Sequence, residues 1–211
     1  MLALILAALA APRVDPGLER SDVPDAYFGW AESQGRPAAA RDLVCRPFAE
    51  GTVLCFSRIE ADRRVLYTRA DGQTLGALES AARGSAKEAV ARLEPVKIDG
   101  FSTPYWVAAV GDGRDHAAVL HPEALRSKLG DTFVVATPAR GVLVAWTPGD
   151  VVFDKIVAVG IRKMYETLPD PVTPLIYGWS SEKGWATWGA AREVVDSVGP
   201  TPIPAAATPN R

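Results

Sequence analysis

The sequence predicts an α+β domain with a mixed, largely antiparallel sheet of hairpins packed by about three helices. First, residues 131–146 contain two apolar runs joined by Pro138-Ala139-Arg140-Gly141. Second, several other short apolar runs are separated by turn-forming residues. Third, apolar residues recur at helical spacing in the stretches 74–93, 122–129 and 151–168.

The two runs at 131–146 form the strongest predicted strand pair. Gly141 can adopt the positive φ that closes a short hairpin, and Pro138 presets the first turn position. Both alternating faces of each run are mostly apolar, which is typical of strands covered on two sides. We therefore expect this hairpin in the middle of a covered sheet. Arg140, at its tip, is interpreted as a solvated turn residue or as a docking point for an acidic group.

Two cysteines flank another predicted hairpin. If residues 49–51 form a three-residue loop with Gly51 in the left-handed conformation, Cys45 lies directly opposite Cys55. Opposed cysteines in an exported chain are expected to form a disulfide. The alternative is a pair of small buried hydrophobic residues, because free cysteine is commonly buried.

The remaining strands and one short helix are expected from turn residues and from periodicity. Residues 42–48, 52–60 and 64–69 form a predicted β-meander, and a helix is expected at 24–33. A strand at 116–120 is expected to return after the polar turn that precedes it. Further strands are expected at 96–99, 105–110, 175–180 and 185–188.

Three longer helices have recognisable ends. Pro95 ends the helix at 74–93, and Gly130 stops the helix that Pro122 opens. Asp150 is the expected N-cap of the helix at 151–168. The residues of this last helix expected to lie against the sheet are Val152, Ile156, Val159 and Met164.

Composition favours one globular domain. The chain of 211 residues is 48% hydrophobic and 23% charged, which suffices for one substantial core. A formal net charge of −2 lacks the basic excess of nucleic-acid-binding proteins, so no nucleic-acid partner is expected. Residues 22–198 are expected to form a single α+β domain, followed by a disordered Pro/Ala-rich tail at 199–211. The sequence does not indicate an oligomeric state.

The N-terminus resembles a secretory signal peptide. Residues 1–11 form an apolar run shorter than the roughly 20 residues that span a bilayer. Ala8-Leu9-Ala10 supplies the small-x-small pattern read by signal peptidase, so residues 1–10 are expected to be removed. The alternatives are a buried N-terminal strand and an incorrectly assigned start. Export predicts a periplasmic or secreted protein with no transmembrane span after cleavage.

Residues 125–146 resemble a known protein family; their sequence is LRSKLGDTFVVATPARGVLVAW. A helix, a Leu-Gly-Asp segment, an apolar strand and Pro-x-Arg before a second apolar strand resemble the YtpQ family of uncharacterised bacterial proteins. The preceding strands and the long alanine-containing helix extend the resemblance to about 42–168. The resemblance implies a fold and no catalytic residue.

Few residues offer catalytic chemistry. His116 follows Asp112 and Asp115 in a predicted turn, a cluster that could bind a metal or perform acid/base chemistry. Asp and Gly are also the residues that a tight turn favours, so a structural role is the alternative. The sequence contains no HExxH, CxxC, GxSxG, Walker or GxGxxG motif. No catalytic residue, metal or cofactor is assigned.

The predicted C-terminal hairpin offers a better functional signal in Trp179, Trp185 and Trp188. With a loop at 182–184, Trp179 lies opposite Thr187, and Trp185 and Trp188 point to opposite sides. At least one tryptophan is therefore expected to point outward, where an indole can stack on sugars or anchor a protein. The alternative is that helices cover both faces and that all three tryptophans are core residues.

These features favour an exported, non-enzymatic domain that binds a protein or an envelope polymer, with the three tryptophans and Arg140 as candidate contacts. Two alternatives stay open. One is a hydrolase acting on an envelope substrate, with His116 and either Asp112 or Asp115 as its acid/base pair. The other is a structural accessory subunit of an envelope complex.

Overall fold

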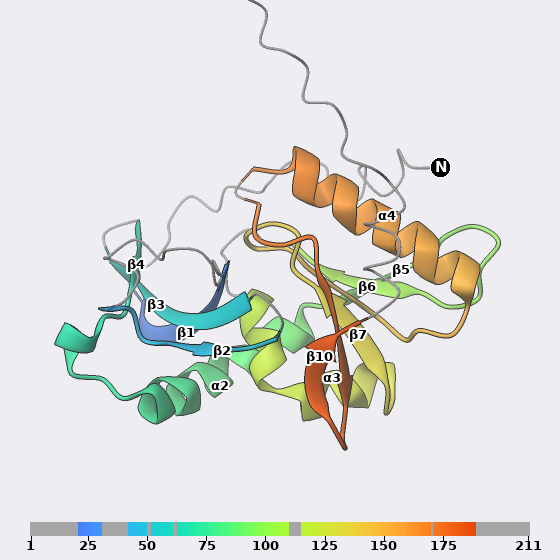
Figure 1. The fold of residues 1–211 in the computed structure, drawn as a ribbon. Coiled ribbons are helices and arrows are strands. Elements are labelled where there is room, and N and C mark those ends of the chain that lie inside the picture. Colours follow the sequence, from blue (N-terminus) through green and yellow to red (C-terminus); the bar gives the residue numbers. More distant parts are fainter. Residues whose placement is uncertain are drawn as a thin grey trace, which may run out of the picture.

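The computed structural model is an α+β fold of two antiparallel sheets and the helices packed on them (Figure 1). The predicted fold class is confirmed, although the strands form two sheets instead of one. The expected signal peptide at 1–10 and tail at 199–211 lie outside the described part of the chain. The structure describes residues 21–30, 42–49, 52–60, 63–109, 115–169 and 171–188.

The smaller sheet is built around β3 (Thr52–Glu60). This strand pairs with β1 (Ser21–Trp30) on one side and with β2 (Cys45–Pro47) on the other. β1 and β4 (Arg63–Leu66) both pair with Ser57 of β3, so they lie on opposite sides of this strand. β4 therefore lies on the same side of β3 as β2. The three predicted strands are thus present, but they do not form a meander. The nine residues of β3 accommodate two short strands in tandem.

β1 corrects the sequence prediction of a helix at 24–33. It is an extended strand at the outer side of β3. Its register shifts between Ser21 and Asp25, so Pro24 lies at an irregularity of an edge strand. Proline is tolerated there because its missing N–H interrupts no regular ladder.

The larger sheet has six strands in the order β10-β9-β7-β8-β6-β5. β7 and β8 hold the two central positions, and every residue in them is buried, which confirms the prediction for this hairpin. The strand bounds are β5 (Glu94–Val96), β6 (Tyr105–Ala108), β7 (Phe133–Ala136), β8 (Leu143–Trp146), β9 (Ile176–Ser180) and β10 (Gly184–Thr187).

The connection between β7 and β8 contains the turn predicted from Gly141. Gly141 has φ 69°, and Val142 N donates to Ala139 O at 3.1 Å. Pro138 lies one residue before this turn and does not occupy its first position. Instead, the Pro138 carbonyl accepts a hydrogen bond from Val172 N at 3.0 Å, which ties the turn to the chain before β9.

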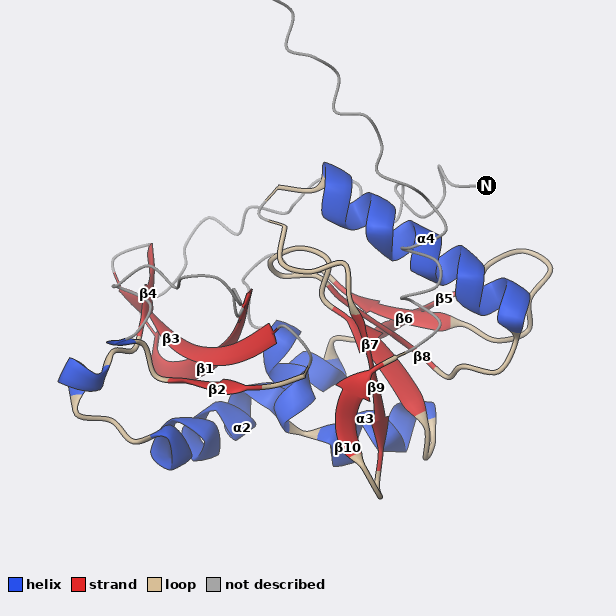
Figure 2. Ribbon diagram, viewed as in Figure 1, coloured by secondary structure: helices blue, strands red, loops and turns tan. Residues whose placement is uncertain are grey.

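Helices cover both faces of the larger sheet, as Figure 2 shows. One face packs against α4 (Val151–Thr167), through a core that includes Trp146 and Phe153. The opposite face packs against α2 (Leu75–Ala91), α3 (Pro122–Leu129) and buried residues of the smaller sheet. Because the second core contains residues from both sheets, the two sheets share one hydrophobic interior. In the described ranges, no helix combines the length and the apolar character needed to cross a membrane.

α4 begins as predicted but faces the sheet with a different set of residues. Asp150 Oδ1 accepts hydrogen bonds from Val152 N at 2.9 Å and Phe153 N at 3.1 Å, which confirms the N-cap. The expectation that Val152 and Val159 face the sheet is wrong, because they are 61% and 39% exposed. Apolar residues stand on several sides of this helix, so periodicity alone did not fix its rotation. The side of α4 that packs in the core carries the buried apolar residues Phe153, Val157, Ala158, Ile161 and Met164.

The strand expected at 116–120 is also a wrong prediction. These residues belong to η3 (Asp115–Leu120), a 3₁₀ helix in which all six residues are buried. A short apolar run bounded by turn residues has no periodicity that separates a buried strand from a buried helical segment. β6 consequently pairs with β5 and β8 instead of a returning strand.

Candidate functional site

β9 and β10 form the hairpin that carries two of the three candidate tryptophans. Trp179 pairs with Trp185, and Ser180 pairs with Gly184. The predicted pairing of Trp179 with Thr187 is therefore wrong by two residues. The turn occupies 181–183, and Ser180 Oγ accepts a hydrogen bond from Lys183 N at 3.3 Å within it. A shift of two residues leaves each side chain on its predicted face.

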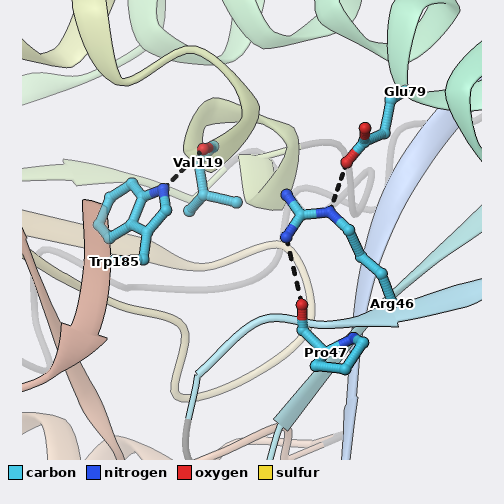
Figure 3. A network of polar contacts seen from close by, with 5 residues as sticks. All are labelled: Arg46, Pro47, Glu79, Val119 and Trp185. Carbon is cyan, nitrogen blue, oxygen red and sulfur yellow. Dashed lines mark hydrogen bonds and ion pairs between the residues drawn. The ribbon is translucent and has the colours of Figure 1, made fainter. Parts of the chain in front are cut away.

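Trp185 joins β10 to three other parts of the molecule. Its Nε1 donates a hydrogen bond to Val119 O in η3 at 3.2 Å, as Figure 3 shows. Its ring centroid lies 5.4 Å from that of Phe48 and 5.8 Å from that of Phe133. The indole is partly buried and held in one orientation by these contacts.

Trp179 lies beside Trp185 on the same face of the sheet. Its ring stacks on Phe133 with centroids 5.2 Å apart and an interplanar angle of 19°. Like Trp185, it packs against the core that the two sheets share while keeping part of its surface exposed. The hairpin thus carries a pair of partly exposed indoles, each in contact with the Phe133 ring of neighbouring β7.

Trp188 lies on the opposite face, as the sequence predicted for Trp185 and Trp188. Its ring makes an edge-to-face contact with Trp146, with centroids 5.7 Å apart. Gly178 lies against this indole, since a Cβ built at Gly178 would be in ordinary van der Waals contact with Trp188 Cδ1, at 3.7 Å. All three tryptophans are partly buried and packed on core residues, so none is a freely projecting indole.

The predicted disulfide positions Phe48 at this hairpin. Cys45 and Cys55 are paired across β2 and β3 and are bonded, with an S–S distance of 2.01 Å. Phe48 follows β2 directly and meets Tyr177 edge-to-face at 5.2 Å, in addition to its contact with Trp185. The disulfide therefore lies in the hairpin that carries the smaller sheet's aromatic contact with the larger sheet.

Arg46 and Glu79 form a contact that sequence reasoning missed. Arg46 Nε donates to Glu79 Oε1, and Arg46 Nη1 donates to Pro47 O at 3.2 Å (Figure 3). This ion pair joins β2 to α2. The side chains of Arg46 and Glu79 are 32% and 27% exposed. Because solvent screens such an ion pair, it contributes little to the free energy of unfolding. No sequence spacing connects two residues this far apart in the chain.

His116 and Asp115, the predicted acid/base candidates, are both fully buried in η3. His116 Nε2 lies 3.3 Å from Ala139 O, and Asp115 Oδ1 lies 3.8 Å from Arg92 Nη1. A substrate could reach neither side chain without local opening of the structure. Asp112 lies outside the described residues.

Arg140 lies in the turn between β7 and β8, as expected, and is exposed although Ala139 and Val142 of the same turn are buried. Across the described ranges, no three His, Cys, Asp or Glu side chains are grouped closely enough to hold a metal ion. Comparisons with protein-family models, curated proteins and solved structures found no match to this chain.

Proposed function

We propose that this chain is an exported, non-enzymatic domain that binds a protein or an envelope polymer through the β9–β10 hairpin. The observation that carries the proposal is the cross-strand pair Trp179 and Trp185, which is partly exposed on one face of the hairpin. Phe133 and the Val119 carbonyl hold these rings before any partner arrives. Preorganised aromatic rings offer a large contact area at a small cost in conformational entropy.

Export is supported by the cysteine chemistry. Disulfides persist in oxidising compartments such as the periplasm and the extracellular space, and they are rare in the cytosol. The bonded Cys45–Cys55 pair is compatible with that environment. We also propose that residues 1–10 are a signal peptide and that the chain belongs to a YtpQ-like family.

The hydrolase alternative has less support. General acid/base catalysis requires the side chain to come within hydrogen-bond reach of the substrate proton. His116 and Asp115 have no exposed surface, and they connect η3 to the turn after β7 and to Arg92 at the end of α2. We interpret them as groups that hold η3 in place, and η3 in turn supplies the Val119 carbonyl to Trp185.

Matched tryptophan variants test the proposal. Immobilised wild-type chain, Trp179→Ala and Trp188→Ala are each incubated with envelope extract and, separately, with purified peptidoglycan. Trp188 is the control because it directly follows β10 but lies on the opposite face of the sheet. Binding through the indole pair predicts that Trp179→Ala reduces capture about tenfold, while Trp188→Ala retains it.

Circular dichroism must show that both variants stay folded. Equal capture by wild-type chain and Trp179→Ala would reject binding through this pair. Capture that depends on neither tryptophan would favour the structural accessory subunit. Hydrolysis of peptidoglycan by the wild-type chain, and its loss in a folded His116→Ala variant, would favour the hydrolase.

A further inference from the structure

The two outer strands of the larger sheet differ in how their edges are protected. β5 contains Glu94 and Pro95, and a charge and a proline are usual means of preventing edge pairing. β10 has the sequence Gly-Trp-Ala-Thr, with neither a charge nor a proline. The β10 edge therefore lacks the chemical protection of the β5 edge.

The hydrogen-bond pattern identifies which backbone groups face outward from β10. Trp188 N donates to Ile176 O at 2.9 Å, so these two residues stand at a hydrogen-bonded position of the ladder. In an antiparallel pair, hydrogen-bonded and non-hydrogen-bonded positions alternate. The register then places Ala186 and Gly184 at hydrogen-bonded positions. The N–H and C=O groups of Trp185 and Thr187 consequently point away from β9.

Those outward groups are not used by the described chain. Within the described ranges, no backbone hydrogen bond joins Trp185 or Thr187 to a residue beyond β9. Ala186, between them, is exposed. In addition, the buried Thr187 Oγ1 has no hydrogen-bond partner in the described structure. A strand edge with unused donors and acceptors is a template for another strand.

We propose that β10 binds an extended segment of a partner polypeptide as a seventh strand of the larger sheet. This inference rests on the proposed function and narrows the partner to a protein. The outward groups of Trp185 and Thr187 repeat every two residues, about 7 Å apart along the strand. A polypeptide in extended conformation presents donors and acceptors with the same repeat, and strand addition to an open edge is an established mode of peptide recognition. The backbone of a glycan contains no N–H and C=O groups that could continue the ladder.

The side chains beside the edge determine what the added strand carries. Trp185 and Thr187 lie on one face and Ala186 on the other, because side chains alternate along a strand. Aromatic and β-branched residues form favourable cross-strand pairs with an indole. The partner segment is therefore expected to place such a residue beside Trp185.

Two substitutions at Thr187 separate backbone pairing from side-chain contact. Thr187→Pro removes an outward N–H without removing a β9–β10 ladder bond, and proline is accepted at such edge positions. Thr187→Val is the matched control, because it keeps the N–H and removes only the hydroxyl that has no partner in the described structure. The probe is a set of peptides about eight residues long, a length typical of strands, selected on the full chain from a displayed random library.

Strand addition predicts that Thr187→Pro weakens binding of the selected peptides about tenfold, whereas Thr187→Val changes it less than about threefold. A second arm leaves the protein unchanged. Peptides N-methylated at alternate residues should lose binding in one of the two possible phases, because only one phase faces β10. This arm decides the question if Thr187→Pro does not fold.

Other outcomes overturn the inference in distinguishable ways. Peptides that bind folded Thr187→Pro as well as wild-type chain, but lose binding to Trp179→Ala, would reject strand addition and leave the proposed function standing. Failure to select any peptide would reject a polypeptide partner, and peptidoglycan capture would then identify a polymer. A concentration-dependent dimer that Thr187→Pro abolishes would assign the edge to a second copy of the chain.

Discussion

The two hairpins of the larger sheet contain the same kinds of residue in different surroundings. β7–β8 has strands on both sides and covered faces, and all eight strand residues are buried. β9–β10 has a neighbouring strand, β7, on one side only, because β10 is an outer strand of the sheet. The residues of β9 become more exposed toward the turn, and no residue of β10 is buried. Trp146 is fully buried and donates to the Asp154 carboxylate, whereas Trp185 is partly exposed and donates to a backbone carbonyl. The central hairpin thus supplies stability, and the terminal hairpin has surface available for binding.

The largest difference between the hairpins is expected from Trp146→Ala. This change leaves a cavity in the core and removes the 2.9 Å hydrogen bond from Trp146 Nε1 to Asp154 Oδ1. The free energy of unfolding should fall by about 3–5 kcal/mol, as for other buried aromatic truncations. Urea denaturation followed by circular dichroism measures the loss. Trp146→Phe is the control that keeps a ring and removes the hydrogen bond, and a loss below about 1 kcal/mol for Trp146→Ala would contradict the account.

Removal of the disulfide should have the next largest effect. The double variant Cys45→Ala, Cys55→Ala releases a closed loop with a sequence separation of 10. Loop-closure entropy predicts a loss of about 2–3 kcal/mol in the free energy of unfolding. Phe48 should also become less well held against Trp185, which tryptophan fluorescence reports. Reductant should destabilise the wild-type chain and leave the double variant unchanged.

A smaller effect is expected when the indole N–H of the terminal hairpin is removed. Trp185→Phe keeps an aromatic ring but loses the hydrogen bond to Val119 O, at a cost of about 1 kcal/mol. Trp179→Phe is the comparison, because Trp179 is held by stacking on Phe133. The difference in unfolding free energy between the two variants measures the contribution of the Trp185–Val119 hydrogen bond to stability. Equal losses would mean that the Val119 contact is unimportant.

The smallest effect is expected outside both hairpins, at Asp71 in η2 (Arg69–Asp71). Hydrogen bonds from Thr68 N and Thr68 Oγ1, both 2.7 Å, lower the pKa of the Asp71 carboxyl below its ordinary value of 3.8, and Arg58 adds to this effect. Because the folded pKa is the lower one, the stabilisation is present above the unfolded pKa and is lost as pH falls through the folded pKa. In Asp71→Asn, the slope of stability against pH in this acidic range should be slightly smaller. An unchanged slope would contradict the assigned hydrogen bonds.

The sequence was most informative where local chemistry determines geometry. The spacing of Cys45 and Cys55 around a turn-forming segment predicted the observed strand pairing and the disulfide, while the left-handed conformation expected for Gly51 lies outside the described residues. Continuous apolar character on both faces predicted the central position of β7 and β8. Asp150 was recognised because an N-cap depends on neighbouring residues alone.

The sequence was least informative where distant segments determine the outcome. β1 is extended because it pairs with β3, an interaction that overrides the apparent helical character of 24–33. The contacts of Arg46 with Glu79 and of Trp185 with Val119 connect residues that no local pattern relates. Likewise, the sequence predicted a β9–β10 register two residues away from the observed one, so Trp179 pairs with Trp185 instead of Thr187.

Amide hydrogen exchange of the free protein measures whether the β10 edge is open. The N–H groups of Ala186 and Trp188 lie in the β9–β10 ladder, and those of Trp185 and Thr187 point to the open edge. An open edge predicts strong protection from exchange at Ala186 and Trp188 and little protection at Trp185 and Thr187. Equal protection at all four amides would show that the edge is already paired, and would contradict an open binding edge at β10.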